Sequence, residues 1–245
     1  MNVTTYNKRQ EEIGAVFLHG VGLRGSVWSE TAERLGIPCL LADFPRRDEA
    51  EDTRADLALE DYISAIQRQI EEWGCERFIL VAHSISGILA MELAQRFQGR
   101  VAGLVAVGAV ISRNGGSFLS SLPAPNRWIL GAILRLAGTK PPESALRKGL
   151  CSDLPPEQAD RVVRDFLPES KRLYTERIRA SAPAGIPKMY VKLTEDKEIT
   201  PSLQNRMIAA LEPEYIEELP SGHLPMLSEP EGLSQALSRM LSLVD

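Results

Sequence analysis

Residues 78–87 read Phe-Ile-Leu-Val-Ala-His-Ser-Ile-Ser-Gly, an apolar run that ends at a serine and leads directly into a second apolar segment. The small residues Ala82 and Ser86 stand two positions before and two positions after Ser84. Small neighbours suit a sharp turn from strand to helix, because the backbone passes close to itself there. The pattern predicts a buried strand, a strained turn that lifts the Ser84 hydroxyl off a sheet, and a helix over 86–97. A serine that only caps this helix remains an alternative.

Apolar runs and amphipathic segments alternate on both sides of this stretch. Such alternation is typical of a mostly parallel sheet with helices on both faces. Residues 46–54 interrupt it with charged side chains and are expected to form a solvated loop. The expected strands are 15–18, 39–42, 78–82, 104–110, 188–193 and 215–219, and the expected helices are 28–35, 56–73, 86–97, 202–211 and 230–243.

The alternation breaks between residues 113 and 182, where no strand is expected. This stretch has proline-rich joints at 123–125 and 141–142, and helical pieces at 128–136, 156–166 and 171–179. Structureless loops of such length are uncommon in compact domains. The sequence therefore predicts a helical cap over 113–182, inserted into a core domain formed by 1–112 and 183–245. A set of ordinary long connections is the alternative.

A serine hydroxyl needs an adjacent base to become a nucleophile, and the chain contains three histidines. His19 follows the first expected strand and is expected to organise that loop. His83 is the direct neighbour of Ser84, and at a tight turn its side chain should point away from the serine hydroxyl. His223 follows the last expected strand in a loop of proline, serine and glycine. By elimination, His223 is the predicted base.

The base in turn needs an acid that orients its ring and stabilises its charged form. An acidic loop follows the strand expected at 188–193, and Asp196 in this loop is the predicted acid. Glu195 and Glu198 are close competitors. The resulting chain order of serine, acid and histidine is known for one large class of hydrolases.

A glycine-rich loop at residues 19–26 leaves the first expected strand. Glycine allows the backbone to approach a substrate closely and leaves amide groups accessible. The amides of Val21 and Ile85 are therefore predicted to form an oxyanion hole, with His19 and Gly20 beside the substrate. Phosphate binding is disfavoured, because the loop has neither the Gly-Lys-Ser/Thr sequence of a P-loop nor the glycine spacing of a dinucleotide motif.

Composition sets further limits. The chain has 245 residues and a formal net charge of -5, which gives no reason to expect nucleic acid or an anionic membrane as a partner. Its three cysteines form no CxxC pair, and no metal or organic cofactor is expected. Residues 1–12 lack the apolar segment of a secretory signal, and 101–111 is too short to span a bilayer. A cytoplasmic monomer or homodimer is expected.

Along nearly its whole length the chain resembles the α/β-hydrolase superfamily. The matching marks are Leu18-His19-Gly20, Ala82-His83-Ser84-Ile85-Ser86-Gly87, Thr194-Glu195-Asp196 and Ser221-Gly222-His223. Within the superfamily it looks most like small carboxylesterases related to plant methylesterases and hydroxynitrile lyases. The resemblance implies the α/β-hydrolase fold with a six-stranded core sheet, and acyl-ester chemistry.

Some residues depart from related enzymes. Serine at position 84 counts against dehalogenases and most epoxide hydrolases of this fold, which resemble the chain but use aspartate. Leu224 stands where related hydroxynitrile lyases have lysine, which disfavours cyanide chemistry. Ala82 and Ser86 replace the glycines of the strict turn motif and leave its geometry open.

The predicted reaction is hydrolysis of a small-molecule carboxylic ester through an acyl-enzyme on Ser84. The segment 128–136 is apolar all round, so it predicts either packing on the core or an apolar wall over the site, with Trp128 in contact with the substrate. A thioesterase, lactonase or carbon–carbon hydrolase would use the same residues. A cofactor-free oxygenase or lyase of this fold is also compatible with the sequence, as is a ligand receptor without catalysis.

Overall fold

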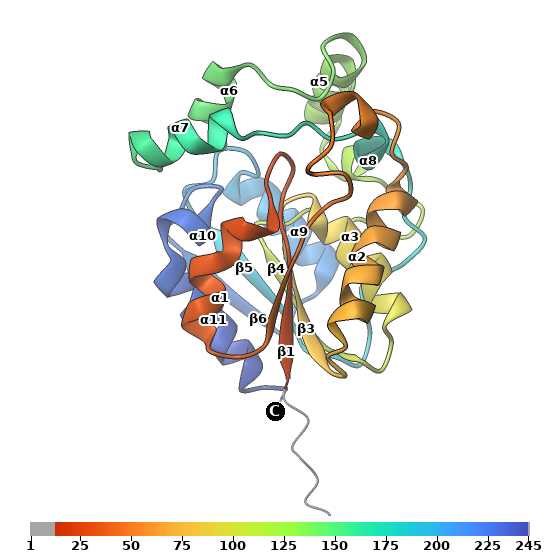
Figure 1. Ribbon diagram of the computed structural model, residues 1–245, viewed down its shortest axis with the longest axis vertical. Helices are drawn as coiled ribbons and strands as arrows, with labels where there is room; N and C mark the ends of the chain where they lie inside the picture. Colours follow the sequence, from red (N-terminus) through yellow and green to blue (C-terminus); the bar gives the residue numbers. More distant parts are fainter. Residues whose placement is uncertain (1–12, 245) are drawn as a thin grey trace, which may run out of the picture.

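The structure is a computed structural model that describes residues 13–244. The expectations for residues 1–12, namely the missing secretory signal and their place in the core domain, lie outside the described residues. Across the described residues, strands and helices alternate around one sheet (Figure 1). None of the helices in this part of the chain combines the length and apolar character needed to cross a membrane.

The sheet has six strands in the order β2-β1-β3-β4-β5-β6, and all neighbouring strands are parallel. The strands are β1 (Gly14–Leu18), β2 (Cys39–Ala42), β3 (Phe78–His83), β4 (Val101–Val107), β5 (Lys188–Leu193) and β6 (Tyr215–Leu219). Every residue of β1, β3 and β4 is buried. Central parallel strands are covered on both faces, which explains why these segments are apolar throughout rather than alternating. The predicted six-stranded fold is confirmed.

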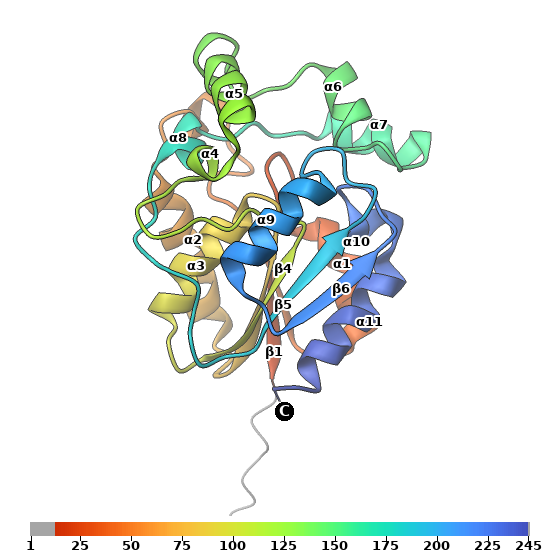
Figure 2. The ribbon, with the colours of Figure 1, turned by 180° about the vertical axis from the view of Figure 1, so that it is seen from behind.

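Helices cover both faces of the sheet, and each face has its own apolar core. One face carries α2 (Leu59–Trp73), α3 (Ser86–Arg96) and α9 (Pro201–Leu211), and Figure 2 shows α9 lying across β4 and β5. The other face carries the short helix η1 (Gly25–Trp28), α1 (Ser29–Leu35), α10 (Pro225–Ser228) and α11 (Pro230–Leu241). Successive strand residues alternate between the two cores: Val16 and Leu18 pack on the first, Ala15 and Phe17 on the second.

The fourth strand is displaced from its predicted position at 104–110. β4 runs from Val101 to Val107, and the chain leaves the sheet at Gly108, where φ is +50°. Residues 109–111 remain buried in a loop beside Ser84, and the amide of Val110 donates to the Ser84 carbonyl oxygen at 2.9 Å. The apolar run of 101–111 therefore indicates that these residues are buried, but only Val101–Val107 have strand conformation.

Residues 113–182 contain five helices and lie over the carboxyl-terminal edge of the sheet (Figure 1). They are α4 (Phe118–Ser121), α5 (Ala124–Leu136), α6 (Glu143–Lys148), α7 (Pro156–Arg164) and α8 (Lys171–Thr175). Proline occupies the first turns of α5 and α7, where its missing N–H costs no helical hydrogen bond. α8 ends at Thr175 rather than at the predicted residue 179, because the backbone becomes extended at Glu176. The division of the chain into a cap and a core domain stays a prediction.

The loop between β2 and α2 also differs from its prediction. The sequence predicts that residues 46–54 are solvated, but Arg47 and Arg54 are only 5% and 1% exposed. The guanidinium of Arg54 donates to the carbonyl oxygens of Arg46 and Glu49, both at 3.0 Å. Residues 51–54 form the short helix η2 (Glu51–Arg54). The expectation holds for most of this loop and fails at Arg47 and Arg54, whose guanidinium groups hydrogen-bond to carboxylate and carbonyl oxygens.

Candidate active site

Ser84 occupies the turn between β3 and α3 with φ of +56°, a left-handed conformation that is strained for a residue other than glycine. Its amide donates to the Val107 carbonyl oxygen at 3.3 Å, and its own carbonyl accepts from Val110. The end of β4 and the loop that follows it thus hold the turn in place through these two hydrogen bonds. The strain and the small neighbours agree with the turn expected from the sequence.

Ser86 adds a contact that glycine at this position could not make. Its hydroxyl donates to the carbonyl oxygen of His19 at 2.5 Å, and its side chain is fully buried. Ala82 is fully buried as well. The two departures from the strict motif therefore fit the turn, and the Ser86 hydroxyl ties the start of α3 to the loop after β1.

Three side chains from distant parts of the chain meet at the carboxyl ends of β3, β5 and β6. The Ser84 hydroxyl lies 3.0 Å from Nε2 of His223, and Nδ1 of His223 lies 2.7 Å from Oδ2 of Asp196. All three residues are at most 5% exposed. Nδ1–H therefore donates to the carboxylate, and Nε2 is left to accept from the serine hydroxyl.

Asp196 is anchored by its own loop. Its second oxygen, Oδ1, accepts the amides of Glu198 at 2.8 Å and Ile199 at 3.0 Å. Glu195 is exposed and Asp196 is 2% exposed, so of the competing acids it is Asp196 that faces the imidazole. Two amide donors fix the orientation of the carboxylate.

Burial of the His223 imidazole opposes protonation, but the charge of Asp196 and its hydrogen bond outweigh burial and raise the pKa of His223 above its ordinary value. Nearby Glu198 and Asp153 act in the same direction. The ring is thus made more basic than a free histidine, which suits the removal of a proton from Ser84.

His83 supports His223 instead of acting on Ser84. Its Nε2–H donates to the main-chain carbonyl oxygen of His223 at 2.8 Å, and the two ring centroids are 4.7 Å apart. Burial, with the neighbouring His223, lowers the pKa of His83 well below its ordinary value, so the ring is neutral. The sequence predicted that His83 points away from the hydroxyl but contained no signal for this contact with the loop of His223.

His19 does not reach the reacting groups. Its side chain is fully buried, with Nδ1–H donating to the Gly20 carbonyl oxygen at 2.7 Å and Nε2 accepting from the Phe44 amide at 3.3 Å. Neither His19 nor Gly20 is among the residues that line the cavity at Ser84, and their contact with a substrate stays a prediction. Both residues shape the loop: a Cβ at Gly20 would lie 2.8 Å from Nδ1 of the buried His83 and 3.1 Å from Cβ of Ser84, so a side chain at position 20 would displace His83.

The two predicted oxyanion donors, the amides of Val21 and Ile85, both lack a hydrogen-bond acceptor within the described residues. Val21 lines the cavity beside Ser84, and Ile85 is fully buried just before the first residue of α3. Within residues 13–244, neither the Val21 amide nor the Ile85 amide donates a hydrogen bond. Free amides at a helix N-terminus favour a negative oxygen.

Comparison with known proteins identifies the family of this chain. The model of the alpha/beta hydrolase family matches residues 15–236. The chain belongs to the alpha/beta hydrolase family. It is 25% identical over 188 residues to methylesterase 17 of Arabidopsis thaliana, a match that covers 69% of this chain and 66% of that protein. It is 27% identical over 177 residues to putative methylesterase 13, chloroplastic, of the same plant, covering 66% of this chain and 40% of that protein.

A solved structure has the same fold. It is an extracellular alpha/beta-hydrolase from a Paenibacillus species, described as a homologue of tobacco salicylic acid binding protein 2. It matches with a TM-score of 0.82 at 20% identity, covering 93% of this chain and 98% of that one. The predicted resemblance to the plant methylesterase group is confirmed.

In this alpha/beta hydrolase, a cavity of about 320 Å³ opens beside Ser84 and His223. Apolar side chains form most of its wall, and one face of α5 contributes Leu130, Ile133 and Leu134. These residues follow helical spacing, so they share a face. Trp128 is 67% exposed and does not line the cavity. Its contact with a substrate stays a prediction, and an evenly apolar helix does not reveal from the sequence which face turns toward the cavity.

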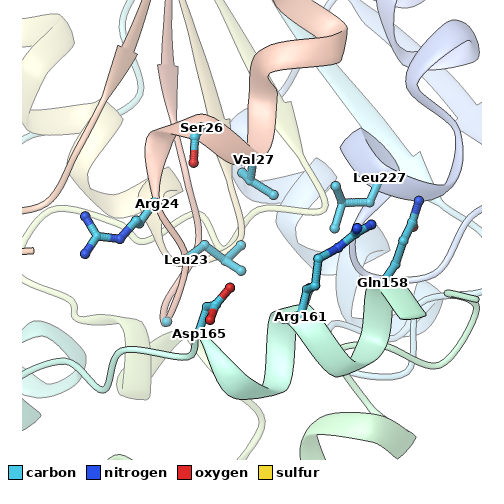
Figure 3. Close-up of a pocket in the computed structure, with 10 residues that line it drawn as sticks. Leu23, Arg24, Ser26, Val27, Gln158, Arg161, Asp165 and Leu227 are labelled. Carbon is cyan, nitrogen blue, oxygen red and sulfur yellow. The ribbon is translucent and has the colours of Figure 1, made fainter. Parts of the chain in front are cut away.

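A second hollow is separate from the cavity that contains Ser84 and His223. It has a volume of about 210 Å³ and lies between residues 22–27 and α7 (Figure 3). Leu23, Val27, Arg161 and Asp165 line it, and neither Ser84 nor His223 does. The reacting groups belong to the cavity under α5 instead.

The segment after α7 holds the loop that carries Val21. The Gly22 carbonyl accepts the Leu167 amide at 3.0 Å, and the Gly22 amide donates to Oε1 of Glu169 at 3.4 Å. Glu169 is buried and pairs with Arg47 at 2.5 Å. Tyr62 donates to the other Glu169 oxygen at 3.2 Å. The position of the Val21 amide therefore depends on residues 166–169.

Gly22→Ala is expected to lower kcat for an ester about 10- to 100-fold, because displacement of the Val21 amide weakens stabilisation of the oxyanion. Gly22 has φ of +78°, and a Cβ there would lie 2.0 Å from the Phe166 ring. Gly115→Ala is the matched control: its φ is also +78°, but nothing lies within 4 Å. Steady-state kinetics of both variants separate backbone strain from the clash. Equal kcat values would contradict this account of the loop.

Proposed function

We propose that this alpha/beta hydrolase is a serine esterase, which hydrolyses a carboxylic ester through an acyl-enzyme on Ser84. The continuous hydrogen-bond path carries this proposal: 3.0 Å from Ser84 to His223 and 2.7 Å from His223 to Asp196. The path ends in a cavity and not in the protein interior. A nucleophile, a base and an orienting acid in this arrangement support acyl transfer.

In the first half-reaction, Ser84 Oγ attacks the ester carbonyl carbon while His223 Nε2 takes the hydroxyl proton. The amides of Val21 and Ile85 bind the carbonyl oxygen as it becomes negative. His223 then returns the proton to the departing alcohol, and the acyl group stays on Ser84. Asp196 stabilises the positive imidazolium during both transfers.

In the second half-reaction, a water molecule takes the place of the alcohol. His223 removes a proton from this water, whose oxygen attacks the acyl carbon. The second tetrahedral oxyanion uses the same two amides. It collapses to release the carboxylic acid, and His223 returns the proton to Ser84.

The cavity and the relatives favour a small ester with an apolar part. Most of the cavity wall is apolar, and its volume is about 320 Å³. An apolar wall binds hydrocarbon by removing it from water. Two relatives carry the name methylesterase, which favours a small alcohol as the leaving group.

The proposal is tested with a fluorophosphonate probe and a panel of substrates. We expect the probe to modify Ser84, as mapped by peptide mass spectrometry, and oxygen esters to be hydrolysed faster than thioesters or lactones of the same acyl group. Modification of a residue other than Ser84 contradicts the proposed nucleophile. Modification of Ser84 without turnover of any substrate favours a ligand receptor.

A further inference from the structure

Glu198 lines the catalytic cavity but has no part in the acyl-transfer steps. It follows Asp196 by two positions, and its main-chain amide donates to that carboxylate. Its side chain borders the cavity with Ser84 and His223, and also a neighbouring hollow of about 260 Å³ between α5 and α9. Both spaces share the lining residues Phe118, Leu130, Ile133, Glu198 and Ile199. Glu198 therefore stands where the two spaces adjoin.

The Glu198 side chain is held from two sides. Its loop is anchored on Asp196 through the amides of Glu198 and Ile199. On the other side, the carboxylate lies against the turn that contains Gly149. A Cβ at Gly149 would overlap Oε1 of Glu198, so the carboxylate rests directly on the backbone of this turn. A side chain fixed in this way keeps its charge at a defined place in the cavity wall.

The carboxylate is the one acidic group among the residues that line the cavity. Lys140 is the one lysine or arginine there, and it forms an ion pair with Glu51 at 3.3 Å. His223 already directs Nδ1 to Asp196. No side chain of the cavity wall therefore neutralises Glu198 by a direct ion pair within the described residues. The charge of Glu198 is nevertheless felt at the reacting groups, since it helps to raise the pKa of His223.

We propose that Glu198 is a specificity-determining residue, which makes the cavity prefer esters that carry a positive charge over neutral esters of the same shape. By the same interaction, it disfavours esters that also carry a free carboxylate group. The inference rests on the proposed ester hydrolysis. Its physical basis is that Glu198 is exposed but borders a cavity with mostly apolar walls, and a ligand in that cavity brings its charge close to the carboxylate with less water between them than in bulk solvent. A cationic substrate group would form the direct ion pair with Glu198 that no side chain of the cavity wall forms within the described residues.

The test compares pairs of esters that differ only in charge. One pair carries the difference on the alcohol, as 2-(trimethylammonio)ethyl and 3,3-dimethylbutyl benzoate. The other carries it on the acyl group, as 4-nitrophenyl esters of 4-(trimethylammonio)butyrate and 5,5-dimethylhexanoate. For at least one pair, we expect the wild type to favour the cationic ester about tenfold in kcat/KM, as for a partly buried charge pair.

Glu198→Gln keeps the size of the side chain and one acceptor oxygen, and it removes the charge. It should bring the kcat/KM ratio of the cationic and neutral esters close to one, and this ratio is independent of any change in rate that both esters share. Glu195→Gln is the matched control, because this acid lies in the same loop and is exposed like Glu198, but it does not line the cavity. The control should keep the preference of the wild type.

The outcomes separate this inference from the proposed function. Hydrolysis without a charge preference in either pair, or a preference that Glu198→Gln leaves unchanged, overturns the role of Glu198 and leaves the esterase proposal intact. If no ester is hydrolysed, the esterase proposal fails. Calorimetric binding of the same esters to Ser84→Ala, with and without Glu198→Gln, then decides whether the cavity discriminates by charge. Equal affinities for the charged and neutral esters overturn the inference there too.

Discussion

Replacement of Ser84 by alanine is expected to lower kcat/KM for a 4-nitrophenyl ester by at least about 10³-fold, because no other group is placed to form the acyl-enzyme. The Ser84 hydroxyl is the one that lies 3.0 Å from Nε2 of His223. In this variant, water would attack the ester directly, and the free amides of Val21 and Ile85 would still stabilise the oxyanion that forms. Stopped assays over hours and active-site titration measure the residual rate.

Ser86→Ala is the matched control for this change. Ser86 belongs to the same turn, but its hydroxyl donates to His19 and not to His223. Loss of one such hydrogen bond costs about 1 kcal/mol, so we expect a loss of activity of about tenfold or less. Thermal unfolding should show that both variants are folded. A folded Ser84→Ala protein that retains the wild-type rate would refute the acyl-enzyme on Ser84.

Asp196→Asn is expected to lower kcat by about 10⁴-fold at neutral pH, because the amide can donate to Nδ1 and so favours the wrong tautomer of His223. The change also alters the pH profile. In the wild type, the pKa of His223 is raised, mainly by Asp196 acting against burial. Activity requires the neutral ring, so it is lost as the pH falls through this raised pKa. Without the carboxylate, burial dominates and the acidic limb should move to lower pH.

The measurement is kcat/KM against pH for the wild type, Asp196→Asn and Glu195→Gln. Glu195→Gln removes a carboxylate from the same loop, but the group it removes is exposed and lies outside the hydrogen-bond path. It should leave both the rate and the acidic limb close to those of the wild type. An acidic limb that stays in place in Asp196→Asn would show that a group other than His223 controls it.

The turn at Ser84 was predictable because its requirements are local. A buried strand, a small residue on each side and an apolar helix follow one another within residues 78–97. The periodicity of residues 56–73 likewise predicted α2, whose buried side chains include Tyr62, Ile66 and Ile70. Elimination among three histidines then led to His223.

The sequence did not show which charged side chains are buried or which side of a helix faces the cavity, because both depend on residues far away in the chain. The charged composition of 46–54 predicted solvation, but Arg47 pairs with Glu169, which lies 122 positions away in the chain. The apolar helix α5 turns Leu130 toward the cavity and Trp128 toward solvent, and composition alone does not distinguish these faces. The sequence presents Glu198 only as a rival of Asp196, since nothing in it indicates that this side chain lines the cavity.

The amino-acid sequence alone determined the alternation of strands and helices, the strained serine turn and the chain order of Ser84, Asp196 and His223. Each of these depends on steric rules and periodicities that act over a few residues. Only the tertiary structure decided which acid faces His223, which residues hold the amide of Val21 and which side chains form the cavity. Those contacts join the ends of strands that lie far apart in the chain. Local sequence patterns predict that a side chain is buried, but they do not identify the residue that it contacts.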